Sequence, residues 1–180
     1  MDRRSFCART AGFGLTLAAG DDLARAMSDP IEAKLAELGL DLPAAAAPVA
    51  AYVPVVVAGG LAHVSGQVPF DAGGELMKGR AGENRDLDYA QAAAQRCALM
   101  ILAQLKAALG DLGRVRRVVK LGVFVNSAAD FTDQPKVANG ASELMVSLFG
   151  DAGRHARSAV GVPALPLGVV VEIDAVVAID

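Results

Sequence analysis

The chain has 180 residues, 53% of them hydrophobic, which is enough for one domain with a sizeable buried core. Its 17 basic and 20 acidic side chains leave a net charge of −3, so no overall positive field favours RNA, DNA or another polyanion. Cys7 and Cys97 indicate neither a disulfide framework nor a thiolate metal site, and no uninterrupted apolar stretch reaches the roughly 20 residues of a membrane span.

The first 26 residues have the form of an export leader. Arg3-Arg4 precedes a weakly apolar stretch, and Ala24-Arg25-Ala26 supplies a small-x-small cleavage pattern, as in a twin-arginine signal. Against this, Asp21-Asp22 cuts the apolar stretch short, and Met27 begins a segment that reads as the natural start of a cytosolic chain. We therefore expect a cytoplasmic protein, with periplasmic export as the alternative, and set residues 1–26 apart from the fold.

A short amphipathic helix and a linker are predicted over residues 27–50. Apolar side chains recur at helical spacing at Ile31, Leu35 and Leu38. Pro30 stands in the first turn and Gly39 at the stop, and an Ala/Pro linker follows over 43–48. Residues 51–180 then form the main domain.

The main domain alternates strands and helices. Its predicted elements are strands at 52–57 and 61–68, a helix at 86–109, a strand at 115–125, a helix from 133 or 135 to 149, and two strands across 155–180. The order β-β-α-β-α-β-β contains two βαβ crossovers in succession. It predicts an α+β fold in which a mixed sheet carries both helices on one face.

Two charged residues near the C-terminus are the candidate active site. Arg157 enters one strand among alanines, and a guanidinium in an apolar cleft is suited to hold a small carboxylate. Glu172 lies within the next strand among Val and Ile, where desolvation should raise its pKa and suit it to proton transfer. The alternative for Arg157 is a salt bridge to Asp151 or Asp174, and for Glu172 it is a structural partner for an arginine. Alternation along the strand leaves the two candidates a way to meet across a cleft.

Neither the histidines nor the basic cluster predicts another function. No second ligand lies at metal spacing from His63 or His155, so no metal site is expected. The cluster at 114–120 has three arginines and one lysine but no interleaved aromatic residues, which favours a solvated end or an interface over an RNA footprint.

Several short motifs stand in order along the chain: Tyr52, Ser65-Gly66-Gln67, Arg157-Ser158, Leu165-Pro166 and Val171-Glu172-Ile173. Together they resemble the RidA/YjgF family of imine and enamine deaminases, also labelled endoribonuclease L-PSP. The resemblance covers about Tyr52 to the C-terminus. It implies a chorismate-mutase-like fold and a homotrimer with active sites between subunits.

The resemblance also implies roles for single residues. Arg157 aligns with the arginine that holds the substrate carboxylate, and Glu172 with a glutamate thought to position the attacking water. The other aligned substrate-binding positions are Tyr52, Ser65, Gly66 and Asn139. Ala50-Ala51 stands where the family usually has Gly-Pro, and Ala159 replaces a common Cys, so the chain resembles a divergent branch.

The expected activity is hydrolytic deamination of 2-imino or 2-enamino acids to 2-oxo acids and ammonia, without a cofactor, because an imine is already electrophilic. The alternative is a trimeric module that binds small carboxylates or oxo acids without turnover. Ribonuclease activity is disfavoured by the charge and by the lack of an acid/base pair beside a basic groove. We expect a small-molecule carboxylate or imine as the ligand, and neither nucleic acid nor membrane as a partner.

Overall fold

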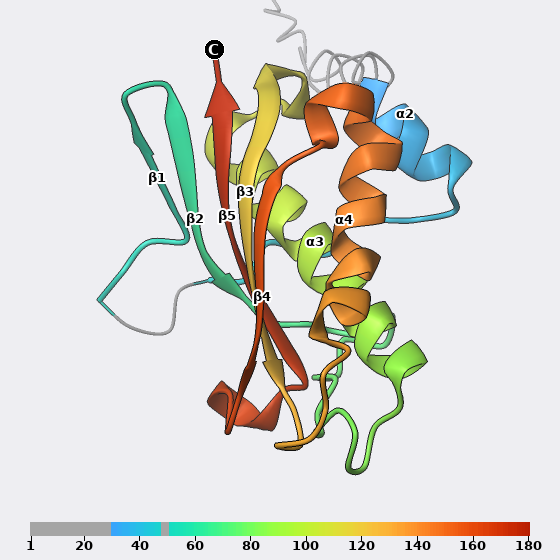
Figure 1. Ribbon diagram of the computed structural model, residues 1–180. Coiled ribbons are helices and arrows are strands. Elements are labelled where there is room, and N and C mark those ends of the chain that lie inside the picture. Colours follow the sequence, from blue (N-terminus) through green and yellow to red (C-terminus); the bar gives the residue numbers. More distant parts are fainter. Residues whose placement is uncertain (1–29, 48–50) are drawn as a thin grey trace, which may run out of the picture.

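The computed structural model describes residues 30–47 and 51–180 (Figure 1). The predicted export leader lies outside these residues. Across the two described ranges, no helix combines the length and the apolar character that a membrane crossing requires.

A five-stranded mixed sheet forms one layer of the molecule (Figure 1). Its strands are β1 (Val55–Ala58), β2 (Leu61–Gln67), β3 (Val115–Asn126), β4 (Ala156–Val162) and β5 (Val171–Ile179). They lie in the order β1-β2-β5-β3-β4. Only β3 and β4 are parallel, and the other neighbouring pairs are antiparallel. The predicted order of elements and the mixed sheet are confirmed.

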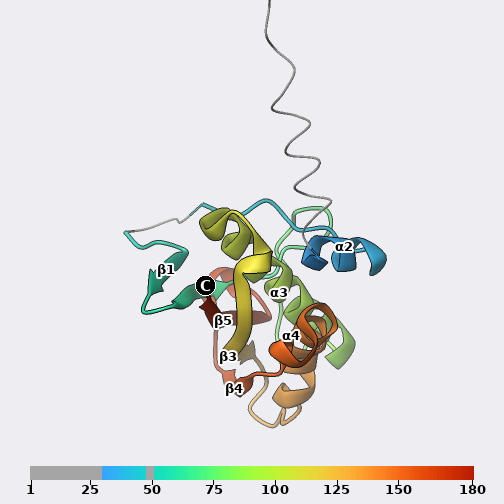
Figure 2. The same cartoon turned by 90° about the horizontal axis from the view of Figure 1, so that it is seen from above.

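Two long helices cover one face of the sheet, as Figure 2 shows from above. Helix α3 (Leu87–Leu109) packs on β2 and β5, and α4 (Gln134–Phe149) packs on β3, β4 and α3. The carboxylate of Asp86 caps α3 by accepting a hydrogen bond from the Tyr89 N–H at 2.9 Å, and Gly110 ends it with a φ of +82°. These caps are the sequence features that place the ends of α3.

The hydrophobic core lies between the helices and the sheet. Alternate residues of β5 are buried from Val171 to Val177, which is the period-two pattern of a strand with one face on the core. Fully buried side chains from both layers form the core, among them Leu99, Ile101, Leu102, Leu105, Leu121, Val123, Met145, Leu148 and Ile173. The short helix α2 (Pro30–Glu37) packs against α4 through Ile31 and Leu35, whereas Leu38 is 50% exposed.

The predicted first strand begins later than the sequence indicated. The ladder of β1 starts at Val55, so Tyr52 lies on the segment that leads into the strand rather than in it. Pro54 supplies the physical reason, because a proline has no N–H to donate to a neighbouring strand.

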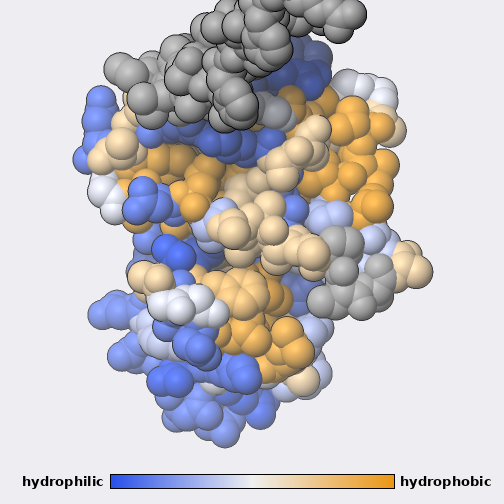
Figure 3. Space-filling model, turned by 180° about the vertical axis from the view of Figure 1, so that it is seen from behind, coloured by the Kyte–Doolittle hydropathy of each residue, from blue (hydrophilic) through white to orange (hydrophobic). Residues whose placement is uncertain are grey.

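The face of the sheet opposite the helices carries exposed apolar residues. The side chains of Val56 and Val160 point to this face and are 50% and 46% exposed, and Phe124 and Val176 lie between them half-buried. Figure 3 views the molecule from behind Figure 1 and shows hydrophobic side chains gathered there in separate patches. Exposed apolar residues gathered on one face in this way are typical of an interface.

Candidate functional site

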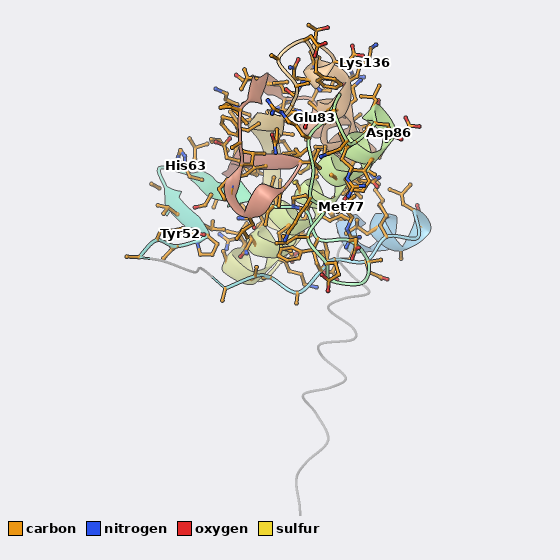
Figure 4. All side chains as sticks on the ribbon, turned by 90° about the horizontal axis from the view of Figure 1, so that it is seen from below. Tyr52, His63, Met77, Glu83, Asp86 and Lys136 are labelled. Atoms are coloured by element: carbon orange, nitrogen blue, oxygen red, sulfur yellow. The ribbon has the colours of Figure 1, made fainter. Side chains whose placement is uncertain are left out.

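Glu172 lies in a mainly apolar pocket at the β2 side of the sheet. The cavity has a volume of about 390 Å³. Its walls include Tyr52, Gly66, Gln67, Met100 and Leu167. We call the set of Tyr52, Gly66, Gln67 and Glu172 the Glu172 pocket. Tyr52 approaches it from the segment before β1, and Figure 4 shows that segment beside the hairpin that carries His63. Three of the predicted site residues are therefore brought together.

The carboxyl of Glu172 has a raised pKa. Burial disfavours the charged form, and the nearby charge of Asp174 raises the pKa further. Within the described part of the chain, no hydrogen bond or ion pair compensates this carboxyl. Such a group holds and releases a proton closer to neutral pH than an ordinary glutamate does, which is what a general acid or base needs.

Gly66 is required by Glu172 itself. A side-chain carbon added at Gly66 would overlap a carboxylate oxygen of Glu172. The close approach that a glycine permits here is therefore made by the glutamate. Any larger residue here would displace the carboxylate from the pocket.

Hydrogen bonds of Ser65 and Gln67 hold the backbone around the pocket. The Ser65 hydroxyl donates to the Val53 carbonyl at 2.9 Å, and this bond ties β2 to the segment that carries Tyr52. The Gln67 amide donates to the carbonyls of Ser65 and Gly66 at 3.0 and 3.2 Å. Gln67 also lines the cavity, although the sequence motif did not predict it as a site residue.

Arg157 is held by helix α4. Its Nη1 donates to Asn139 Oδ1 at 3.0 Å and to Ser142 Oγ at 2.9 Å. The salt bridge considered as an alternative does not form, because Asp151 pairs with Arg154 and Asp174 accepts from the Gly122 N–H. Arg157 has no acidic partner within residues 30–47 and 51–180, so its charge is left for a ligand.

Sequence reasoning missed two neighbours of Arg157. Ser142 Oγ lies 3.0 Å from His155 Nε2, and His155 Nδ1 lies 2.6 Å from the Gly153 carbonyl. Their spacing in the sequence could have predicted them. Ser142 lies three residues after Asn139, on the same side of one helix, and His155 lies two residues before Arg157, on the same side of the chain at the start of a strand. We call Asn139, Ser142, His155 and Arg157 the Arg157 cluster.

The side chains of Glu172 and Arg157 lie on opposite faces of the sheet. Arg157 is in register with Leu121, and Leu121 with Ala175, both of which face the helices. Glu172 is in register with Phe124 on the other face. Strand β3 also separates β4 from β5. The expectation that the two candidates meet across a cleft is therefore wrong within one chain, because β3 and the opposite orientation of the two side chains separate them.

Other polar groups in the described part of the chain form no metal centre. No group of three or more His, Cys, Asp or Glu side chains there is placed to hold an ion. In the basic cluster, Arg114 and Arg116 both bind Asp180, and Arg117 donates to two backbone carbonyls.

Comparison with known proteins shows to which family the chain is similar. A family model described as "YjgF/chorismate_mutase-like, putative endoribonuclease" matches residues 32–177, which begins well before Tyr52. Protein TCP17 of Trypanosoma cruzi is 53% identical over 154 residues, covering 85% of this chain and 96% of that protein.

Solved structures agree with this match. Protein Atu1372 of Agrobacterium tumefaciens has a TM-score of 0.79 and 49% identity, covering 88% of this chain and 99% of that one. Escherichia coli TdcF with bound serine has a TM-score of 0.55 and 25% identity, covering 76% of this chain and 94% of that one. The family model, the relative and the folds all agree, and the chain belongs to the YjgF/RidA family with its chorismate-mutase-like fold.

Proposed function

We propose that this protein is a hydrolytic deaminase of 2-imino and 2-enamino acids, acting as a homotrimer whose active sites lie between subunits. The observation that carries the proposal is the Glu172 carboxyl, which has a raised pKa and faces an apolar pocket with no compensating partner among the described residues. Membership of the YjgF/RidA family supports the same activity.

Arg157 would hold the substrate carboxylate. Because Asn139 and Ser142 occupy only Nη1, the edge formed by Nε and Nη2 has no partner within the described residues. Two parallel N–H groups on that edge match the two oxygens of a carboxylate. The serine bound to TdcF is an amino acid with such a carboxylate, which supports this class of ligand.

Glu172 would manage the protons of the hydrolysis. As a water oxygen attacks the imine carbon, the carboxylate of Glu172 takes a proton from that water, and the imine nitrogen gains a proton to give a carbinolamine. A second proton transfer to nitrogen lets the carbon–nitrogen bond break and ammonia leave. The carbinolamine hydroxyl gives up its proton as the 2-oxo acid forms.

A second subunit is needed to complete this site. The Glu172 pocket and the Arg157 cluster face away from each other in one chain, and β4 is an edge strand that a neighbouring subunit can approach. The apolar residues on the open face of the sheet give such a neighbour a surface to bury. In the proposed trimer, the Arg157 cluster of one subunit faces the Glu172 pocket of the next.

The activity is tested with imines generated in solution. An amino-acid oxidase or threonine dehydratase supplies 2-iminopropanoate or 2-iminobutanoate, and ammonia release is followed with and without the protein. We expect the wild type to accelerate release and Arg157→Ala to lower kcat/KM about 100-fold, the effect of losing charged hydrogen bonds to a carboxylate.

Arg154→Ala is the matched control, because Arg154 is three residues away and 73% exposed in its pair with Asp151. It should behave as the wild type. No acceleration by the wild type across several imines would reject the deaminase. If calorimetry then detected binding of 2-oxobutanoate that Arg157→Ala abolishes, the carboxylate-binding module would replace it.

A further inference from the structure

A continuous set of hydrogen bonds leads from the backbone to Arg157. It runs from the Gly153 carbonyl through the His155 ring and the Ser142 hydroxyl to Nη1 of Arg157, with distances of 2.6, 3.0 and 2.9 Å. All three side chains are partly buried. The set connects the loop after α4, the helix itself and the start of β4.

Chemistry fixes the direction of each bond. A carbonyl oxygen only accepts, so His155 Nδ1 carries the hydrogen that faces Gly153. In the neutral ring, Nε2 is then an acceptor, and the Ser142 hydroxyl donates to it. The lone pairs of Ser142 Oγ are thereby left to accept from Arg157.

Without His155 the Ser142 hydroxyl could donate its hydrogen bond elsewhere. A serine within a helix commonly donates to the backbone carbonyl four residues earlier, which turns its oxygen away from other donors. By taking the hydroxyl hydrogen, His155 keeps the oxygen of Ser142 directed at the guanidinium. We infer that Ser142 and His155 are positioning residues, which orient Arg157 so that its Nε–Nη2 edge is presented to the ligand.

The predicted effect of these residues on substrate binding rests on the proposed function. It is a change in KM rather than in kcat. Ser142→Ala should raise KM for 2-iminobutanoate, and Kd for 2-oxobutanoate, about tenfold, because one hydrogen bond that orients the guanidinium is lost. The value of kcat should stay within about twofold, because the proton-transferring Glu172 is untouched. Ser147→Ala on the same helix is the control, since Ser147 lines a groove away from Arg157.

Two variants of His155 distinguish the contributions of its two ring nitrogens. The terminal amide of glutamine reaches the position of Nε2, so His155→Gln retains an acceptor for Ser142 and should stay within about twofold of the wild type. The shorter asparagine reaches only the position of Nδ1, so His155→Asn should resemble Ser142→Ala. Equal KM and Kd values for Ser142→Ala and Ser147→Ala, or for His155→Gln and His155→Asn, would overturn the inference.

A readout without substrate keeps this test independent of the deaminase proposal. The chain has two histidines, His63 and His155, so a His63→Gln variant labelled with nitrogen-15 in histidine reports His155 alone by NMR. For the neutral ring we expect hydrogen on Nδ1 and none on Nε2. A neutral ring with its hydrogen on Nε2 would reject this set of hydrogen bonds even if the wild type deaminates imines. Absence of deamination with the expected tautomer would reject only the proposed activity.

Discussion

At the scale of single residues, Glu172 lies where its surroundings disfavour the charged form of its carboxyl. Its carboxyl is half-buried, lies against Gly66 and has the charge of Asp174 nearby. A charge that is disfavoured in the folded protein lowers the stability whenever the group is ionised. Retention of an acidic group in such a place is typical of a functional site.

Replacing Glu172 with glutamine should stabilise the protein at neutral pH. The pKa is raised in the folded state, so the wild type is stabilised by Glu172 protonation at low pH and loses that stability as pH rises through the folded pKa. Glu172→Gln carries no ionisable group there. Its melting temperature should therefore exceed that of the wild type at pH 7. The difference should shrink as pH falls through the folded pKa and vanish below about 4.3, the ordinary glutamate pKa.

Glu143→Gln is the matched control, because it removes an exposed carboxyl from α4. Melting curves of both variants between pH 3.5 and 8 measure the effect. A Glu172→Gln variant that is less stable than the wild type at pH 7, or whose advantage is the same at every pH, would contradict a carboxyl with a raised pKa.

At the scale of elements, one glycine sets the distance between α3 and α4. A side-chain carbon added at Gly140 would overlap the backbone carbonyl of Gln91, so the two helices approach closely at this point. Asn139 lies directly before this contact and Ser142 two residues after it. The spacing of the helices therefore also places the two acceptors that hold Arg157.

Gly140→Ala should force the helices apart. We expect a loss of about 1–3 kcal/mol in the free energy of unfolding, which is the usual cost of overpacking a tight contact. Urea denaturation measures this, and KM should rise as well because Asn139 and Ser142 move with α4. Ser147→Ala makes an exposed change on the same helix and should alter stability little. If Gly140→Ala matched that control, the close contact would not constrain the helices.

Local sequence patterns predicted most of the helices and strands, because the interactions that start and end these elements lie close in sequence. Asp86 and Gly110 bound α3 by capping, and the alternation of β5 follows from its own side chains. The order of strands depends on pairing between distant segments, and no local pattern reported that β3 separates β4 from β5. For this reason Arg157 and Glu172 were found as candidates while their placement on opposite faces was missed.

At the scale of the whole molecule, the two halves of the candidate site require different surfaces to come together. The Glu172 side chain lies on one face of the sheet, and the Arg157 cluster lies between β4 and α4 on the other. Closed rotational symmetry brings two different surfaces of one chain together at every interface of a ring. A homotrimer would then contain three sites, each with Arg157 from one subunit and Glu172 from the next.

Mixed trimers test this arrangement directly. Chains carrying Arg157→Ala and chains carrying Glu172→Gln are co-expressed with different affinity tags, and trimers that hold both tags are isolated. In a ring of three with both chain types, one interface joins an intact Arg157 to an intact Glu172, so about one third of the wild-type deaminase activity should return.

The control for the mixed trimers uses two differently tagged Arg157→Ala chains, which contain no intact Arg157 and should stay inactive. Sizing chromatography of each preparation confirms that trimers are compared with trimers. If both residues acted within one chain, every subunit of the mixed trimers would lack one of them and no activity would return. Recovery therefore requires that the site is shared between subunits, because only contact between different chains can join the two intact residues.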